Sequence, residues 1–144
     1  MKIQTAIKPE SIEKCFDVLQ TLRPHLVKSN FISLIEGMIT RGYHLVFIEE
    51  NNQAIACAGF RYTEHLHWGK LIYIDDLSTL PDHRGKGYAS LLLNFIEDLA
   101  KEMKFNSIHL DSGTVPARYD AHRLYLKKGF NISSFHFALG IKQK

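Results

Sequence analysis

One segment in the middle of the chain, residues 77–90, constrains the fold more than any other part of the sequence. An extended apolar run ends at Pro81, a basic turn with Gly85 and Gly87 follows, and an apolar helical pattern begins at once. Glycines let a backbone approach an anion closely and expose consecutive N–H groups. The start of a helix adds unpaired N–H donors and the positive end of its dipole. The strand, the glycine turn and the helix together predict a diphosphate-binding site.

Two common phosphate-binding patterns do not fit this turn. The nicotinamide fingerprint G-x-G-x-x-G lacks its glycines beyond Gly85 and Gly87, and the nucleotide-hydrolase loop G-x-x-x-x-G-K-[ST] has a different spacing. The pattern Arg84-x-x-Gly87-x-Ala89 instead resembles the R/Q-x-x-G-x-G/A signature of the GCN5-related N-acetyltransferases, which hold the diphosphate of acetyl-coenzyme A. The alternative is an ordinary basic turn in front of a helix.

The resemblance implies which residues bind the coenzyme. They run from the end of the strand into the first turn of the helix: Leu77, Ser78, Thr79, Arg84, Gly85, Lys86, Gly87, Tyr88, Ala89 and Ser90. In the family, backbone groups at the positions of Leu77 and Thr79 bond the pantetheine arm as if it were another strand. This arrangement requires a gap between that strand and the next one, expected at Ser107 to Leu110.

A second motif lies downstream at the expected distance. Residues 121–130 resemble the family's A-x-x-x-Y-x-x-x-G-F segment, and the tyrosine at the position of Tyr125 often points at the coenzyme sulfur in the family. The chain departs from the family at Arg118, where many members carry asparagine. The last quarter of the chain is similar to a bacterial subgroup that includes aminoalkylphosphonate N-acetyltransferases, which implies a small primary amine as the acceptor.

The pattern of apolar residues predicts a mixed α/β plan around one sheet, in the order β-α-α-β-β-β-α-β-α-β, which matches the acetyltransferase fold. The expected strands are 2–7, 43–49, 54–62, 70–79, 107–110 and 132–141. The expected helices are 9 to Pro24, about 29 to Gly42, 87–104, and 117–128 with Gly129 as C-terminal cap. We expect a single N-acetyltransferase domain over residues 1–144.

Composition excludes several classes of function. The chain has 144 residues, of which 45% are hydrophobic, and its net charge is only +3 with no long basic block, so nucleic acid is not favoured as a partner. No signal segment or bilayer-length apolar stretch appears, so the expected compartment is the cytoplasm. Cys15 and Cys57 lie in apolar surroundings and are predicted to be buried free thiols.

Acetyl transfer from a thioester to an amine needs a base, an oxyanion donor and a proton for the leaving thiolate. Asp75 and Asp76 lie just before the expected pantetheine contacts, and strand alternation allows only one to face the acceptor directly. The candidate base is Asp76, acting through water, and Tyr125 is the candidate acid. A backbone N–H near Leu77 or Ser78 would polarise the carbonyl. Neither cysteine lies beside a motif, so direct transfer in a ternary complex is favoured over an acyl-enzyme.

The histidines leave alternatives open. His65 and His67 lack a third ligand at useful spacing, so no metal site is expected. His109 either reaches the acceptor or pairs with Asp111. His122 either orients Tyr125 or the substrate, or lies at the surface.

Acetylation of a protein lysine or N-terminal amine is the second choice of acceptor, and a non-catalytic acyl-coenzyme A sensor is the rival class. The exposed last strand makes a homodimer possible.

Overall fold

The computed structural model describes residues 2–144, and these form two compact units, which divide after Leu110. The first unit holds a five-stranded sheet in the order β1-β2-β3-β4-β5. Its strands are β1 Ile3–Thr5, β2 His44–Glu50, β3 Gln53–His65, β4 Gly69–Thr79 and β5 Ser107–Leu110. All neighbours are antiparallel except β4 and β5, which run parallel.

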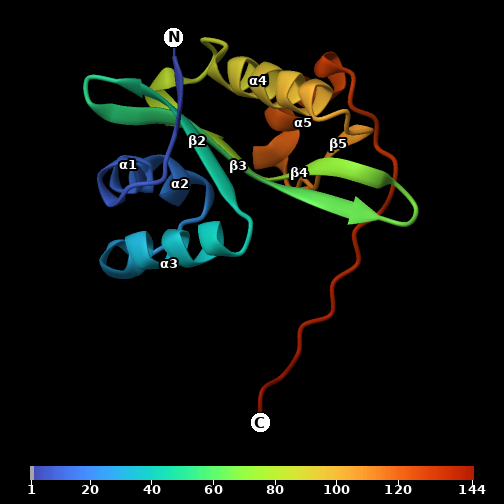
Figure 1. The fold of residues 1–144 in the computed structure, drawn as a ribbon, viewed down its shortest axis with the longest axis horizontal. Helices are drawn as coiled ribbons and strands as arrows, with labels where there is room; N and C mark the ends of the chain where they lie inside the picture. The colour runs from blue at the N-terminus through green and yellow to red at the C-terminus, as the bar shows by residue number, and fades with distance from the viewer. Residues whose placement is uncertain (1) are drawn as a thin grey trace. The chain divides into compact units, whose positions relative to one another are not determined.

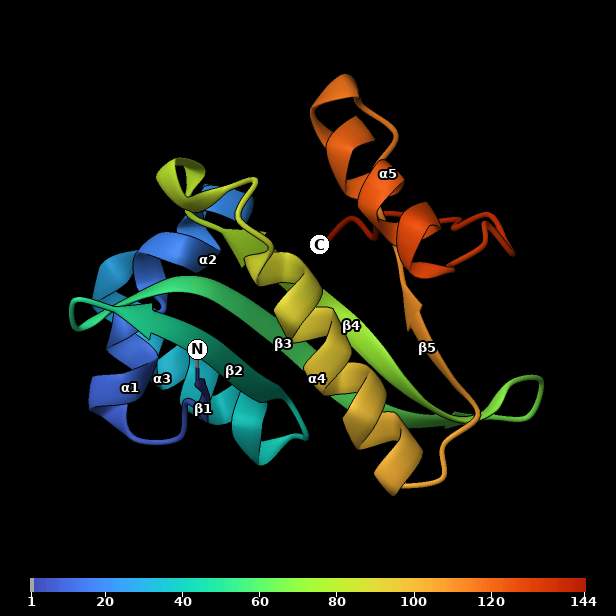
Figure 2. The ribbon, with the colours of Figure 1, turned by 90° about the horizontal axis from the view of Figure 1, so that it is seen from above.

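Helices cover both faces of this sheet (Figure 1). One face carries α1 Pro9–Lys14, α2 Phe16–Leu22 and α3 Lys28–Thr40, and the other carries α4 Tyr88–Glu102. The core under the first three helices joins Ile12, Phe16 and Phe31 to the strand residues Leu45 and Phe47. On the opposite face, α4 lies across β3 and β4 (Figure 2) and buries its apolar stripe Leu92, Leu93, Ile96 and Ala100. The 3.6-residue period of that stripe is what makes α4 a helix with one buried side.

The two sides of β4 are paired over different lengths. Pairing with β3 continues to the end of the strand at Thr79, whereas pairing with β5 stops where Ile74 meets Leu110. Among the described residues, the β5-facing edge of residues 75–79 therefore has no strand partner. A gap at this edge is what the predicted pantetheine contacts require.

A bulge interrupts β4 just before that edge. Opposite β3, Gly59 pairs with Asp76 and Phe60 pairs with Ile74, so Asp75 is an extra residue in the ladder. A bulge bends the strand and breaks the strict alternation of its side chains. The alternation expected for Asp75 and Asp76 therefore does not hold.

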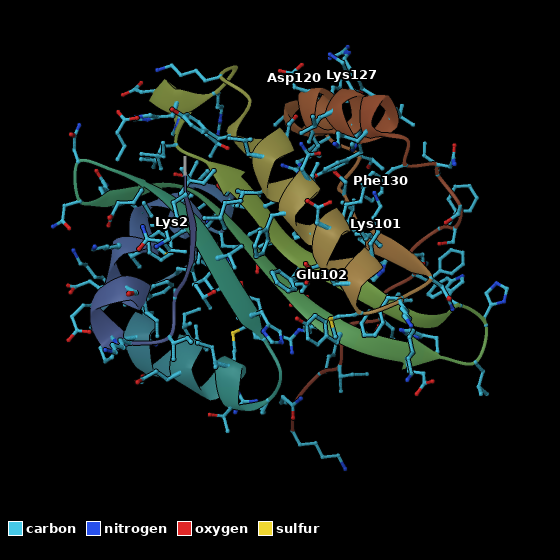
Figure 3. All side chains as sticks on the ribbon, turned by 45° about the horizontal axis from the view of Figure 1, so that its top comes forward. Lys2, Lys101, Glu102, Asp120, Lys127 and Phe130 are labelled. Carbon is cyan, nitrogen blue, oxygen red and sulfur yellow. The ribbon has the colours of Figure 1, made fainter. Side chains whose placement is uncertain are left out.

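The second unit holds a 3-10 turn at Pro116–Arg118 and α5 Tyr119–Lys128, which Gly129 ends with φ +101°. Figure 3 shows Lys127 projecting away from α5. Beyond Gly129, the remaining residues form no helix or strand.

The predicted mixed α/β fold is confirmed, and the order of elements holds from the first strand through α5. The single first helix is in fact two, because the last turn of α1 tightens: the Cys15 N–H bonds the Ile12 carbonyl at 3.0 Å. The strand expected over 132–141 is absent. Strands need a neighbour for their hydrogen bonds, and this segment has none within its unit, so its apolar side chains stay exposed. Both cysteines are buried free thiols, as predicted.

Candidate functional site

The predicted diphosphate loop lies between β4 and α4 and is built from backbone. A 3-10 turn at Pro81–His83 leads into it, and the Arg84 Nε donates to the Thr79 carbonyl at 3.4 Å. Gly85 and Gly87 have φ values of +75° and +87°, and a Cβ added to either would meet nothing within 4 Å. The positive φ explains why glycine is required, and the open space leaves room for a bulky anion.

The N-terminus of α4 points its unpaired donors into this loop. Gly87 is the N-cap, and the first backbone bond of the helix runs from the Leu91 N–H to the Gly87 carbonyl at 3.0 Å. The N–H groups of Tyr88, Ala89 and Ser90 consequently have no intrahelical acceptor. No acidic residue lies in the first turn, so nothing there competes with an anionic ligand. The loop fits a diphosphate.

Three of the predicted coenzyme residues lie on β4 itself. Ser78 is buried, and its Oγ donates to the Val18 carbonyl of α2 at 2.9 Å. Its side chain is thus part of the packing between sheet and helix, and only its backbone remains for a ligand. Leu77 and Thr79 lie on the edge that β5 leaves unpaired. Their side chains alternate with that of Ser78 and so point to the opposite face of the sheet.

Asp75 and Asp76 belong to a cluster of five residues, Arg23, Tyr43, Arg61, Asp75 and Asp76, which we call the β4 charged cluster. Asp76 accepts from the Arg23 Nε at 3.0 Å and from the Tyr43 hydroxyl at 2.7 Å, through different carboxylate oxygens. Asp75 accepts from the Arg61 Nε at 2.8 Å through Oδ2, and its backbone carbonyl accepts from Arg23 at 2.8 Å. The bulge therefore brings both acids into one network.

Tyr43 contacts both Asp76 and Arg61 in this network. Its hydroxyl lies so close to Gly59 that a Cβ there would fall 1.7 Å from the oxygen. The Arg61 guanidinium lies 5.4 Å from the centre of the Tyr43 ring, a cation–π distance. Burial, followed by the Asp76 carboxylate, raises the pKa of Tyr43 well above its usual value, so the hydroxyl stays protonated and donates.

The two acids differ in how fully they are bonded. Both oxygens of Asp76 have partners, whereas the Asp75 Oδ1 is buried without a hydrogen-bond partner among the described residues. Burial raises the pKa of Asp75, the Arg61 hydrogen bond opposes that rise, and the Asp76 charge adds to it. A carboxyl with a raised pKa is the better proton acceptor near neutral pH.

Tyr125 lies in the second unit, where α5 positions it. The side chain is buried, and its ring lies 5.8 Å from that of Phe130. Burial raises the pKa of Tyr125, and Arg118 partly lowers it. Arg118, which departs from the family pattern, thus stands where it can stabilise the phenolate, and its Nε also lies 3.4 Å from the Ser112 Oγ.

Four of the histidines contact neighbouring polar groups or the ring of Trp68. His122 uses its Nε2 toward the Gly113 carbonyl at 2.7 Å and the Ser112 Oγ at 3.0 Å. His109 contacts Ser107 at 2.9 Å, and its ring lies against Trp68. His65 and His67 also lie against Trp68. Among residues 2–144, no group of three or more His, Cys, Asp or Glu side chains could hold a metal ion.

Sequence reasoning missed Arg23, Tyr43 and Arg61. Arg23 is the C-cap of α2, Tyr43 directly precedes β2, and neither stands in a motif. Arg61 could have been singled out from the sequence, since it is the first charged residue after the buried run 54–60 of β3. A charged residue that follows directly on a buried run is a candidate for an ion pair with a nearby acid.

Comparison with known proteins agrees with this geometry. The profile of the Acetyltransferase (GNAT) family matches residues 11–130. An uncharacterized N-acetyltransferase, YhdJ of Bacillus subtilis, is 31% identical over 130 residues, which is 89% of this chain and 90% of that protein. An aminoalkylphosphonate N-acetyltransferase of Salmonella typhimurium is 32% identical over 102 residues, 70% of this chain and 65% of the relative.

Solved structures share the fold at low sequence identity. A putative acetyltransferase from Agrobacterium tumefaciens superposes with a TM-score of 0.82 at 19% identity, covering 98% of this chain and all of that one (100%). The aminoglycoside N-acetyltransferase AAC(6')-Iy, solved in complex with CoA, gives 0.81 at 14% identity, covering 99% and 95%. With the profile match over most of its length, the chain belongs to the Acetyltransferase (GNAT) family, and it is an acetyl-CoA-dependent N-acetyltransferase.

Proposed function

We propose that the chain acetylates the primary amine of a small molecule by direct transfer from acetyl-CoA. The observation that carries the proposal is the continuity of β4, which joins the diphosphate loop, an unpaired strand edge and two acids within residues 75–90. A thioester laid along that edge would have its carbonyl near the acids. The partial match to an aminoalkylphosphonate N-acetyltransferase supports a small amine over a protein acceptor.

In the proposed reaction the amine nitrogen attacks the thioester carbonyl, an N–C bond forms and the C–S bond breaks. The ammonium proton passes to a carboxylate of the β4 charged cluster, directly or through water, and the leaving thiolate takes the Tyr125 proton. Of the two acids, the sequence favours Asp76 as the base. Its two oxygens are both bonded, while the Asp75 pKa is raised and the Asp75 Oδ1 lacks a partner, so Asp75 is the stronger candidate.

The experiment that tests the function mixes the purified protein with acetyl-CoA and a panel of amines and follows release of free thiol. Acetyl-dependent thiol release with at least one amine, matched by N-acetylated product in mass spectrometry, is expected. Tight binding of acetyl-CoA without thiol release across small amines and lysine peptides would instead favour the non-catalytic sensor.

Tyr125→Phe tests the acid role. Only the hydroxyl is lost, so we expect turnover to fall roughly tenfold or more while coenzyme affinity changes little. Tyr119→Phe is the matched control, because Tyr119 lies on the same helix and is half exposed. If the two variants turn over equally fast, Tyr125 is not the proton donor.

A further inference from the structure

The acidic and basic side chains of the β4 charged cluster differ in exposure. The acid side chains are less exposed, at 13% for Asp76 and 22% for Asp75. The arginine side chains are more exposed, at 33% for Arg61 and 45% for Arg23. Two more exposed cationic side chains therefore lie beside the two less exposed acids.

The guanidinium groups of Arg61 and Arg23 have nitrogens that are free to donate to a ligand. Arg61 uses its Nε for Asp75, and its terminal nitrogens donate to no group among residues 2–144. Arg23 uses Nε and one terminal nitrogen, which leaves its other terminal nitrogen without an acceptor in the described chain. Planar guanidinium forks of this kind match carboxylate and phosphate-like oxygens.

One carboxylate oxygen of the cluster, the buried Asp75 Oδ1, accepts no hydrogen bond from the described residues. An unpaired buried acceptor is costly, so it favours a ligand that supplies a proton donor. For an N-acetyltransferase the ligand's natural donor is the ammonium group of the acceptor.

From these unbonded arginine nitrogens and the unpaired Asp75 Oδ1 we propose that the acceptor is zwitterionic. It would be a primary amine joined by a short chain to a carboxylate, phosphonate or sulfonate. Its anion binds the free nitrogens of Arg61 and Arg23, and its ammonium group bonds the Asp75 Oδ1. A purely cationic amine would instead be repelled by the positive charges of Arg61 and Arg23. This inference rests on the proposed function and narrows its substrate class.

The test compares amines that differ only in the distal group: 2-aminoethylphosphonate, β-alanine, propylamine and 1,3-diaminopropane. Titration calorimetry in the presence of CoA measures binding, and thiol release from acetyl-CoA measures turnover. We expect the two anionic amines to bind and react roughly tenfold better than propylamine, and 1,3-diaminopropane to be the poorest, since one charge-assisted hydrogen bond is worth about that factor.

Arg61→Met and Arg23→Met should abolish this preference mainly through KM, and Arg61→Lys should restore part of it. Arg41→Met is the matched control, because Arg41 is exposed at the end of α3, outside the cluster. Equal binding of propylamine and the anionic amines, or an unchanged preference in both methionine variants, would overturn the inference. Selective binding of the anionic amines without any thiol release would leave the inference standing and count against the proposed function.

Discussion

The two ends of the candidate site, residues 75–90, are built in opposite ways. At the diphosphate loop the backbone carries the chemistry: Gly85 and Gly87 take positive φ, and the ligand donors are main-chain N–H groups. At the β4 charged cluster the side chains carry it, and Asp76 is held by Arg23 and Tyr43 from distant parts of the chain. The loop therefore depends on local conformation, whereas the cluster depends on packing of the whole first unit.

The largest effect is expected where that packing is tightest. Gly59→Ala would place a methyl group 1.7 Å from the Tyr43 hydroxyl and 2.3 Å from the ring carbon that bears it. The ring must move and the bond to Asp76 is lost, so we expect a loss of about 3 kcal/mol in the free energy of unfolding, measured by urea denaturation.

Gly140→Ala is the control for that substitution, since an added Cβ there meets nothing within 4 Å and the residue has no positive φ. Tyr43→Phe in the Gly59→Ala background should not rescue stability, because the ring carbon would still clash. A Gly59→Ala protein as stable as the wild type would mean that the cluster yields more easily than its packing indicates.

At the backbone end, Gly87→Val should act mainly on the coenzyme. The side chain would crowd the diphosphate and a β-branched residue resists φ +87°. We expect the Kd for acetyl-CoA to rise roughly 30-fold, about 2 kcal/mol, by calorimetry. Gly42→Val separates the two causes, since Gly42 has φ +103° and equally open space but ends α3 far along the chain from the loop. It should lose stability and keep coenzyme affinity; parallel losses of affinity in both variants would contradict the loop assignment.

The same contrast explains what the sequence could reveal. The loop was predictable, because its function requires glycines at fixed spacing beside a strand and a helix, and all these signals lie within a few residues. The charged cluster was predictable only in its acids. Asp75 and Asp76 stand in the motif-bearing strand, but the bulge that groups them and the contacts from Arg23 and Tyr43 arise from tertiary packing. The strand expected at 132–141 did not form, because an alternating sequence does not provide the neighbouring strand with which it must pair.

Tyr43→Phe tests the cluster more gently than the glycine change. The ring and its packing stay, and only the donor to the Asp76 Oδ2 is lost. A hydrogen bond to a carboxylate is worth about 1.5 kcal/mol, so we expect that loss in urea denaturation. Tyr119→Phe, on the exposed side of α5, should cost nearly nothing. If both variants are equally stable, Asp76 is held by Arg23 alone.

The smallest effect is expected in the pH dependence of stability. Burial raises the pKa of Asp75 in the folded protein above its usual value of 3.8, so the folded state binds this proton more tightly than the unfolded state. The contribution of Asp75 to stability is therefore complete below pH 3.8 and is lost as the pH rises through the folded pKa. Asp75→Asn removes this loss, since an amide does not titrate.

The unfolding free energy of Asp75→Asn relative to wild type should thus increase on going from about pH 3 to about pH 7, by less than about 1 kcal/mol because the group is partly exposed. Asp120→Asn supplies the control, since its side chain is fully exposed on α5 and should leave that difference flat. A flat difference for Asp75→Asn as well would mean that Arg61 offsets the burial completely. The bulge would then hold an ordinary ion pair, and Asp75 would lose its advantage over Asp76 as the base.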